Sequence, residues 1–457
     1  MDQSFEVDAD VIIIGGGFAG AVALRELSSR GVNCILLEAR DCLGGRTKTI
    51  EWHGRVTEVG GQWLHWLQPH VWSEVTRYGL ELYERKPIQR VRYASGGAIR
   101  ECSVDEFHDL YSGAWQTLYA GATDVFPRPH DPLYARAKLA GIDKLSIRDK
   151  LTADGVEGEV LDAVRALASV SFNAPPDDGA LSQGMRRLAM VGGDPDLLAQ
   201  TLQQFRLRDG TRRLHSAILS EGEGSIELNA VVSQIRQNPQ AVEILLADGR
   251  TFTSRAAVVT VPLSTLGDIE FSPPLAKGKS AFVSEGQMTQ GSMFWLRLRN
   301  MPQEALLALA PPEHPLSYLR VDDEEKDGTV IANGFSPSRK ALDPSDRSAI
   351  EKAVRLWVPK AQLVEHVCHD WATDPFSKQT WTMLKPGQLS SYFDDLQRPE
   401  GSVFFAGADY ASGWFGFIDG AIQSAHVASR QVAAYLQEKG LEHSGSLNKV
   451  DKQQRVA

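Results

Sequence analysis

The 457-residue sequence lacks several features that would assign it to whole classes of protein. Its four cysteines show neither a CxxC pair nor a spacing typical of metal ligands, so we expect reduced thiols and no metal site. No run of about eighteen apolar residues is present to form a helix that spans a bilayer. The first ten residues, MDQSFEVDAD, are acidic, whereas a secretory signal begins with a basic and then an apolar stretch. These absences predict a cytoplasmic protein with no membrane partner.

Positive charge is also in short supply. Lys and Arg number 48 against 58 Asp and Glu, which gives a net charge of −10, and no local basic run compensates. Surfaces that bind nucleic acid need clustered positive charge, so no nucleic acid is expected as a partner. The hydrophobic fraction of 42% is in contrast ample for a folded core. The length suits two domains.

The first forty residues contain the pattern of a dinucleotide-binding unit. The apolar run 10–14 is typical of a strand buried on both faces of a parallel sheet. A glycine-rich turn follows it, and then a segment of good helix formers at 21–30. A second apolar run, 32–37, ends in Glu38. Strand, glycine turn, helix, strand and acid stand in the order of the dinucleotide fingerprint.

Each residue of this fingerprint has a physical role. Gly15 permits the tight turn, Gly17 lets the backbone approach a pyrophosphate, and Gly20 lets the helix pack on the strand. The helix N-terminus offers free N–H groups and positive potential to the phosphates. Glu38 can accept hydrogen bonds from both ribose hydroxyls, which favours an unphosphorylated 2′-OH over NADP. The fingerprint alone leaves FAD and NAD open.

The segments that follow favour FAD. EARDCLGGRTKT (38–49), followed by EVGGQW (58–63), resembles the second flavin signature of the flavin-containing amine oxidase family, which includes monoamine, polyamine and bacterial nicotine oxidases. GSVFFAGADYASGWFGFIDGAIQSAHVASRQ (401–431) resembles the last flavin signature of this family. The resemblance covers nearly the whole chain, from Asp10 to about Leu436.

The resemblance implies a set of FAD-binding residues. Arg40 and Arg46 would lie along the adenosine and pyrophosphate. Asp409, where the family more often has Glu, would sit by the ribityl chain or pyrophosphate, and Ile418 would offer its N–H to the ring. The complete expected set is Gly15, Gly17, Phe18, Ala19, Gly20, Glu38, Ala39, Arg40, Gly45, Arg46, Gly60, Gly61, Gln62, Trp63, Val232, Gly407, Asp409, Phe417 and Ile418.

The segment DPFSKQTW (374–381) is similar to the family's stretch that crosses the flavin face. Covalent monoamine oxidases have a cysteine there that bonds the flavin, and this sequence has Thr380, so we expect non-covalent FAD. Trp381 and Phe417 match the two walls of the family's aromatic cage. A narrow slot between two rings strips water from an amine and favours its neutral form.

One position departs from the family's pattern. Most family oxidases have a lysine that holds a water against flavin N5, whereas this sequence aligns Met293 there, with no lysine between Lys279 and Lys326. A thioether carries no charge and donates no hydrogen bond. We therefore expect the reduced flavin to react slowly with oxygen. The electron acceptor is then either oxygen or a redox protein, and the sequence does not decide between them.

The expected fold class is α/β, with a Rossmann-like FAD-binding domain interleaved with an α+β substrate domain. Residues 81–200 suggest a largely helical cap, and 294–299 alternates like a strand with one buried face. The resemblance also implies a homodimer. The FAD-binding domain is expected to take residues 1–80, 205–282 and 380–437, the substrate domain 81–204 and 283–379, and a polar tail 438–457.

The resemblance implies oxidation of the C–N bond of a small-molecule amine. Hydride would pass to flavin N5, and the imine would hydrolyse to an aldehyde or ketone plus amine or ammonia. The aromatic slot suggests an apolar or aryl-alkyl amine, such as a nicotine-pathway or biogenic amine. Further residues expected near this substrate are Trp66, Trp72, Phe172, Trp295 and His65.

Two alternatives stay open. An L-amino-acid oxidase, or another flavoenzyme of the same fold, would act on a different substrate; an amino-acid oxidase needs an arginine for the carboxylate, for which Arg92 and Arg320 are candidates. A flavin-bearing protein that has lost catalysis is supported only by Met293.

Overall fold

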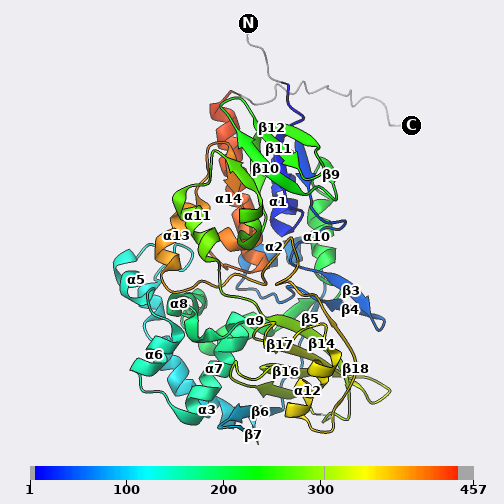
Figure 1. Cartoon of the computed structure of the whole chain (residues 1–457), viewed down its shortest axis with the longest axis vertical. Helices are drawn as coiled ribbons and strands as arrows, with labels where there is room; N and C mark the ends of the chain where they lie inside the picture. The colour runs from blue at the N-terminus through cyan, green and yellow to red at the C-terminus, as the bar shows by residue number, and fades with distance from the viewer. Residues whose placement is uncertain (1–5, 303, 441–457) are drawn as a thin grey trace, which may run out of the picture.

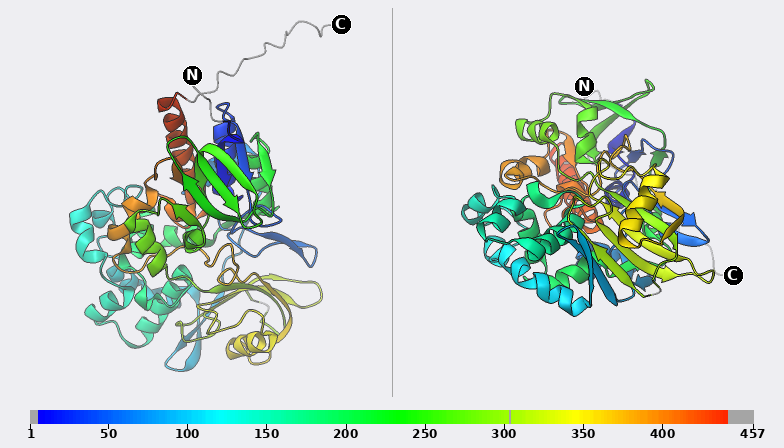
Figure 2. Two further views of the ribbon diagram at one scale, coloured as in Figure 1. Left: turned by 45° about the horizontal axis from the view of Figure 1, so that its top comes forward. Right: turned by 60° about the horizontal axis from the view of Figure 1, so that its bottom comes forward.

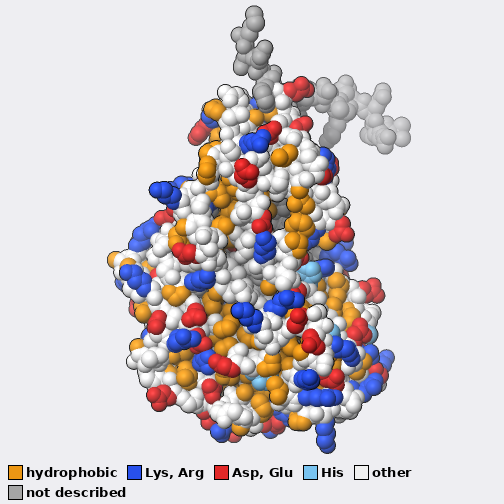
Figure 3. All heavy atoms as spheres, in the orientation of Figure 1, with side chains coloured by type: hydrophobic (Ala, Val, Ile, Leu, Met, Phe, Trp, Pro, Cys, Tyr) orange, Lys and Arg blue, Asp and Glu red, His pale blue; other side chains and the backbone are white. Residues whose placement is uncertain are grey.

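The computed structural model describes residues 6–302 and 304–440. Two units, each built on its own sheet, lie one above the other in Figure 1. Most of the expected polar tail lies outside the described residues. Basic and acidic side chains are interspersed on the face shown in Figure 3, with no broad area of either sign.

The upper unit contains an eight-stranded sheet with the fingerprint at its centre. Strand β1 (Ala9–Ile14) is buried along its whole length and pairs in parallel with β2 (Cys34–Leu37) and β12 (Thr251–Val259). Helix α1 (Phe18–Ser28) follows the glycine turn, so the predicted strand, turn, helix and strand are confirmed. The remaining strands are β9 (Ser225–Glu227), β10 (Val232–Gln237), β11 (Val242–Leu246), β13 (Glu270–Ser272) and β19 (Val403–Phe405).

Helices from distant parts of the chain pack on this sheet. The last helix, α14 (Ile418–Glu438), lies beside α1, and α10 (Thr211–Leu219) contacts α1 as well (Figure 1). Arg25 of α1 forms a buried ion pair, 2.6 Å long, with Glu74 of α2 (Pro69–Arg77). No helix in residues 6–302 and 304–440 is long and apolar enough to cross a membrane.

The lower unit contains a seven-stranded sheet. Its order is β18-β14-β17-β16-β15-β6-β7, so β6 (Arg90–Ser95) and β7 (Ala98–Cys102) join strands that come some two hundred residues later in the chain. The expectation of a mainly helical segment at 81–200 therefore missed these strands. The others are β14 (Ser292–Arg299), β15 (Leu306–Leu309), β16 (Tyr318–Glu324), β17 (Val330–Ser336) and β18 (Gln362–Cys368).

Strand β14 was expected to have one buried face, and this is confirmed for its second half, where Leu296 and Leu298 are buried while Arg297 is half-buried and Arg299 is exposed. In its first half both faces are covered, because the strand lies inside the sheet. Phe294 and Leu296 pack on the core under α12 (Arg347–Trp357). Trp295, on the opposite face, packs against Trp52 and donates its indole N–H to the Glu58 carbonyl at 2.7 Å. The polar alternation is therefore confined to the second half of the strand, where one face is less covered.

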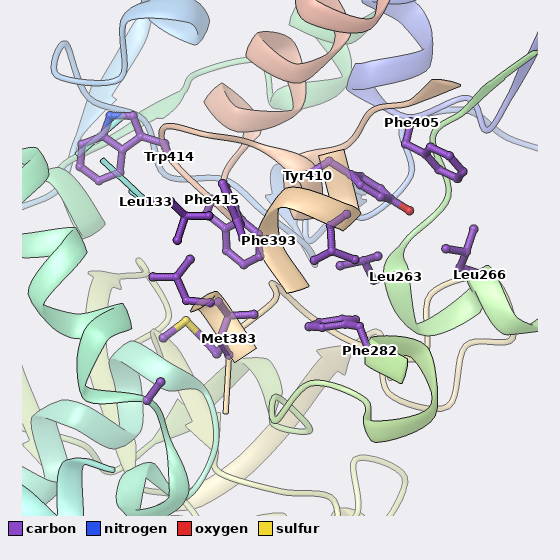
Figure 4. Packing of buried hydrophobic residues seen from close by; sticks show 14 of the residues in the cluster. Leu133, Leu263, Leu266, Phe282, Met383, Phe393, Phe405, Tyr410, Trp414 and Phe415 are labelled. Atoms are coloured by element: carbon purple, nitrogen blue, oxygen red, sulfur yellow. The ribbon is translucent and has the colours of Figure 1, made fainter. Parts of the chain in front are cut away.

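Most of the predicted helical cap is present beside the lower sheet (Figure 2). Met383 and Phe415 pack with Phe282 and Phe393 in one apolar cluster (Figure 4). The cap helices are α3 (Val104–Leu118), α4 (Ala122–Val125), α5 (Arg136–Ile142), α6 (Ile147–Ala153), α7 (Gly158–Phe172), α8 (Leu181–Met190) and α9 (Pro195–Gln203). The remaining elements are β3 (Thr49–Trp52), β4 (Arg55–Glu58), β5 (Leu82–Glu84), β8 (Phe205–Leu207), α11 (Lys277–Glu285) and α13 (Gln388–Gln397).

Close packing of α1 on the glycine turn makes Gly20 intolerant of a side chain. A Cβ atom there would lie 1.9 Å from the carbonyl oxygen of Gly15. We expect Gly20→Ala to lower the free energy of unfolding by about 1–3 kcal/mol, as over-packing does. Urea unfolding followed by circular dichroism measures this change. Gly113→Ala on α3, where a Cβ meets nothing within 4 Å, is the control, and equal losses in both variants would contradict the prediction.

Candidate active site

One cavity of about 1220 Å³ extends from the glycine turn of the upper unit to the sheet of the lower unit. Ligand pockets usually enclose about 300–1,000 Å³. The cavity is therefore large enough for an extended dinucleotide together with a second small molecule. Its walls come from both units, because β1, β14, β16 and the start of α14 all contribute side chains or backbone.

The end of the cavity at the glycine turn fits a dinucleotide. Gly17 caps α1 without any side-chain hydrogen bond, so the first N–H groups of the helix are left for an anion. Gly15 has φ +109°, and a Cβ there would lie 2.6 Å from the Thr260 hydroxyl. Glu38 is buried and accepts hydrogen bonds from the backbone N–H of Gly16 (2.7 Å) and Arg40 (2.8 Å), which fixes its carboxylate at the edge of the cavity.

Arg46 ties three distant segments together. Its guanidinium donates to the Thr380 carbonyl at 2.8 Å and forms an ion pair with Asp409 at 2.9 Å. Asp409 is fully buried and also accepts a hydrogen bond from the Gln379 amide at 3.0 Å. Arg46 lines the cavity and Asp409 does not, so Asp409 acts on the cavity by holding Arg46.

Arg40 also lines the cavity, and its guanidinium is engaged by the crossing segment. It pairs with Asp374, donates to the Ser377 hydroxyl at 2.9 Å and lies over the Phe376 ring. Burial alone would raise the pKa of Asp374, but the His369 hydrogen bond and the charge of Arg40 outweigh it and lower this pKa to about 2. Asp374 therefore stays ionised at neutral pH and anchors the crossing segment (374–381) to Arg40 of the second flavin motif (38–49).

The residues expected to bind FAD gather around this one cavity. All of them line it except Asp409 and Gly20, and Gly20 instead packs against Gly15. The lining members are Gly15, Gly17, Phe18, Ala19, Glu38, Ala39, Arg40, Gly45, Arg46, Gly60, Gly61, Gln62, Trp63, Val232, Gly407, Phe417 and Ile418.

The three residues expected at the reacting end also line the cavity. Trp381 donates its indole N–H to the Ser171 carbonyl at 3.3 Å. Phe417 stands directly before α14, with its ring edge-on to Trp414 at 5.3 Å between centroids. Met293 is buried, and its sulfur accepts a hydrogen bond from the Gln62 amide at 3.6 Å. Aromatic, apolar and backbone groups thus surround this part of the cavity.

Arg187 of α8 was missed from the sequence. Its guanidinium lies over the Phe417 ring at 5.3 Å and donates to the Ser171 carbonyl at 2.8 Å, the same oxygen that Trp381 uses. No carboxylate pairs with it in the described part of the chain. Burial lowers the pKa of Arg187 to about 10, so the group stays charged at neutral pH. The available signal was two adjacent arginines, Arg186 and Arg187, with no acidic residue between Asp178 and Asp194.

Other side chains expected near a substrate lie elsewhere. Among the described residues that line the cavity, none of Trp66, Trp72, Phe172, Trp295 and His65 is found. Trp66 is 45% exposed, while His65 is fully buried against it. Trp295 instead packs in the cluster with Trp52 and donates to the Glu58 carbonyl, as described above.

The two arginines considered for a carboxylate also differ in position. Arg92 lies on β6 outside the cavity lining and pairs with Glu101 at 2.7 Å. Arg320 of β16 is buried and lines the cavity. Arg85, which the sequence did not single out, lies beside it and over the Trp63 ring.

The chain has relatives of known name that it matches over most of its length. The chain is 35% identical to a pseudooxynicotine dehydrogenase of Pseudomonas sp over 95% of its own length and 88% of the relative's. It is 34% identical to a nicotine dehydrogenase of Pseudomonas putida, covering 94% of this chain and 89% of that one. Both matches extend over nearly the whole of each protein.

Solved structures share the fold. Putrescine oxidase bound to putrescine superposes with a TM-score of 0.81 at 19% identity, over 93% of this chain and 99% of that one. Cyclohexylamine oxidase from Brevibacterium oxydans gives 0.78 at 21% identity, over 94% and 100%. The sequence model of the family described as flavin containing amine oxidoreductase matches residues 18–433. The chain therefore belongs to the flavin containing amine oxidoreductases, and FAD is its cofactor.

Proposed function

We propose that this enzyme oxidises an apolar or aryl-alkyl amine and passes the electrons to a redox protein more readily than to oxygen. The observation that carries the proposal is the single cavity that joins the dinucleotide turn to Trp381, Phe417 and Met293. We further propose that residues 1–80, 205–282 and 380–437 form the FAD-binding domain. The substrate domain would consist of 81–204 and 283–379.

In this proposal the chain holds FAD at several points. The first N–H groups of α1 and the side chain of Arg46 would bind the phosphates, and Glu38 the ribose. The backbone at 60–63 and the N-terminus of α14 would lie along the flavin ring. When bound, FAD supplies the acceptor for a hydride from the carbon next to nitrogen.

The chain's own side chains would set the state of the amine. Trp381 and Phe417 exclude water around the nitrogen, which disfavours the ammonium form. The positive charge of Arg187 over Phe417 acts in the same direction, because like charges repel at short range in a poorly hydrated cavity. The amine would therefore bind in its neutral form, in which the nitrogen lone pair can assist loss of the hydride.

The carboxylates of the cavity argue against a diamine substrate. Among the described lining residues the carboxylates are Glu38, Asp196 and Asp268. Glu38 is at the dinucleotide turn, Asp268 pairs with Lys378 at 2.6 Å, and the Asp196 side chain is 76% exposed. A second ammonium group would therefore find no buried carboxylate at the cage. An amine with one basic nitrogen suits these walls better.

The electron acceptor is proposed from the chemistry of Met293. This residue brings neither a charge nor a proton to its side of the cavity. Dehydrogenase is also the name given to the two Pseudomonas relatives described above, which supports an acceptor other than oxygen.

Anaerobic bleaching of the visible flavin band by a panel of amines tests the function. The panel contains a nicotine-type amine, tyramine, phenethylamine, putrescine and an L-amino acid. We expect fast bleaching by aryl-alkyl amines and slow or no bleaching by putrescine. Bleaching by putrescine alone, or by none of the panel with FAD fully bound, would contradict the proposal.

The role of Met293 gives a second prediction. We expect Met293→Lys to raise the second-order rate of flavin reoxidation by oxygen at least about tenfold, which corresponds to roughly 1.4 kcal/mol in the barrier. Stopped-flow mixing of the reduced enzyme with aerated buffer measures this rate. Met293→Leu is the control, since leucine is also uncharged, and it should leave the rate unchanged. A wild-type enzyme that already reoxidises as fast as the lysine variant refutes the argument.

The charge of Arg187 gives a pH prediction. A nearby cation lowers the pKa of a bound amine, so removing that cation in Arg187→Met should move the bound amine's pKa upward. The rise in the rate of flavin bleaching with pH should then occur at higher pH in the variant. Arg187→Lys, which keeps the charge, should retain the wild-type midpoint. A profile that stays in place in Arg187→Met would show that the charge does not act on the amine.

Thr380 at the position of the covalent cysteine predicts that FAD is released on denaturation. Acid precipitation and centrifugation should leave the yellow colour in the supernatant. Yellow colour that remains in the protein pellet would contradict non-covalent binding.

A further inference from the structure

A cluster of arginines on the lower unit shares one carboxylate. Asp322 of β16 pairs with Arg85 at 2.6 Å and lies 3.8 Å from both Arg320 and Arg206. The side chain of Asp322 is 2% exposed. Among the described residues, Asp322 is the only carboxylate within ion-pair distance of any of these three arginines. One negative charge lies within ion-pair distance of three positive charges, and the buried carboxylate of Glu58 acts on Arg206 from further away. The cluster therefore keeps a net positive charge.

The cluster also has more donors than acceptors. Arg85 donates to the Gln203 side chain and the Tyr318 hydroxyl, each at 3.1 Å, yet its Nη2 is buried with no hydrogen-bond partner. Arg320 donates to the Lys86 carbonyl, and its Nε is likewise buried without a partner among the described residues. One acceptor of the cluster, the Oδ2 oxygen of Asp322, is also buried without a hydrogen-bond partner, so two such donors stand against one acceptor. Unsatisfied buried donors of a charged group are costly, and the cost falls when an acceptor arrives.

The cluster faces the substrate part of the cavity. Arg85, Arg320, Tyr318 and Gln203 all line it, whereas Arg206 does not. Tyr318 packs edge-on against Phe335 at 5.3 Å, and Phe335 packs edge-on against Trp381 at 6.4 Å. A continuous aromatic wall therefore leads from the cage to the arginines, and an aryl-alkyl body can lie along it.

From this arrangement we infer a subsite, formed by Arg85, Arg320 and Tyr318, that binds a hydrogen-bond acceptor on the substrate. The acceptor is a carboxylate or a neutral carbonyl at the end of the molecule away from the amine. Guanidinium donors suit both groups, and the excess positive charge repels a second ammonium. The inference rests on the proposed function for the statement that this ligand is the substrate.

Four shape-matched ligands that are not amine substrates test the subsite in the wild-type holoenzyme. Hydrocinnamate carries a carboxylate, benzylacetone a ketone, isopentylbenzene neither, and phenethyltrimethylammonium a fixed positive charge. Shifts in the flavin absorption band give their dissociation constants without turnover. We expect hydrocinnamate or benzylacetone to bind at least about tenfold more tightly than isopentylbenzene, with the cation weakest. Equal affinities, or tightest binding of the cation, would overturn the inference.

Variants locate the preference. Arg320→Met should remove the advantage of the acceptor-bearing ligands and leave isopentylbenzene unchanged. Arg206→Met is the matched control, since it removes a charge from the same cluster but not from the cavity wall, and it should keep most of the advantage. Loss of the preference in Arg187→Met, with Arg320→Met unaffected, would assign the acceptor to the cage and overturn the subsite. If Arg320→Met fails to retain FAD, the wild-type ranking still decides.

The outcomes separate two failures. A preference for acceptors with no amine oxidised would support the subsite and remove the proposed function. Amine oxidation without any preference for ligands that carry an acceptor would support the proposed function and overturn the subsite. Tight binding of hydrocinnamate alone would show that the subsite requires a carboxylate. Tight binding of both hydrocinnamate and benzylacetone would show that it accepts either a carboxylate or a ketone oxygen.

Discussion

The ion pair between Arg46 and Asp409 is the contact on which the cavity depends. It joins the second flavin motif (38–49) to the last (401–431), and Arg46 also donates a hydrogen bond to the Thr380 carbonyl of the crossing segment. Asp409 is fully buried, so loss of its partner would leave a charge without compensation in the interior. A planar guanidinium has several N–H donors in fixed directions, so it can donate hydrogen bonds to a carboxylate and a carbonyl at the same time, whereas the single ammonium group of lysine does this less well. Trp381 follows Thr380 directly, so the same contact helps to place the Trp381 ring on the cavity wall.

Positive charge lines the cavity at both of its ends. At the glycine turn, the first N–H groups of α1 and the guanidinium of Arg46 provide the positive potential that we propose binds the phosphates of the cofactor. In the lower unit, Arg85, Arg187 and Arg320 line the walls, and Asp322, which does not line the cavity, pairs with Arg85 and lies 3.8 Å from Arg320. Buried positive charge beside an aromatic cage is compatible with an amine that enters neutral. It also leaves room for a substrate whose other polar group accepts hydrogen bonds.

The sequence predicts well what local geometry dictates. The turn at Gly15–Gly17, the strand before it and the acid at Glu38 form a local unit, because each follows from backbone conformation and burial over a short stretch. The positions of Trp381, Phe417 and Met293 at one cavity also follow, since the motifs around them resemble those of a known family.

Contacts between distant segments were not predictable in the same way. Asp409 pairs with Arg46, and the first half of β14 is covered on both faces, because of neighbours that lie far away in the chain. The role of Arg187 depends on α8 meeting the start of α14. An arginine in a sequence is normally a surface charge, and only the fold shows that Arg187 is buried with no carboxylate paired to it in the described part of the chain.

A crystal structure of the FAD-loaded enzyme with a non-reactive analogue of an aryl-alkyl amine that carries a ketone tests the central claim most directly. That claim is that cofactor and substrate share one cavity, with the amine at the cage. We predict density for the analogue with its nitrogen beside Trp381 and Phe417 and its ketone oxygen within hydrogen-bond distance of Arg320 or Arg85. An analogue bound outside this cavity, or with its nitrogen at the arginine cluster, would contradict the account.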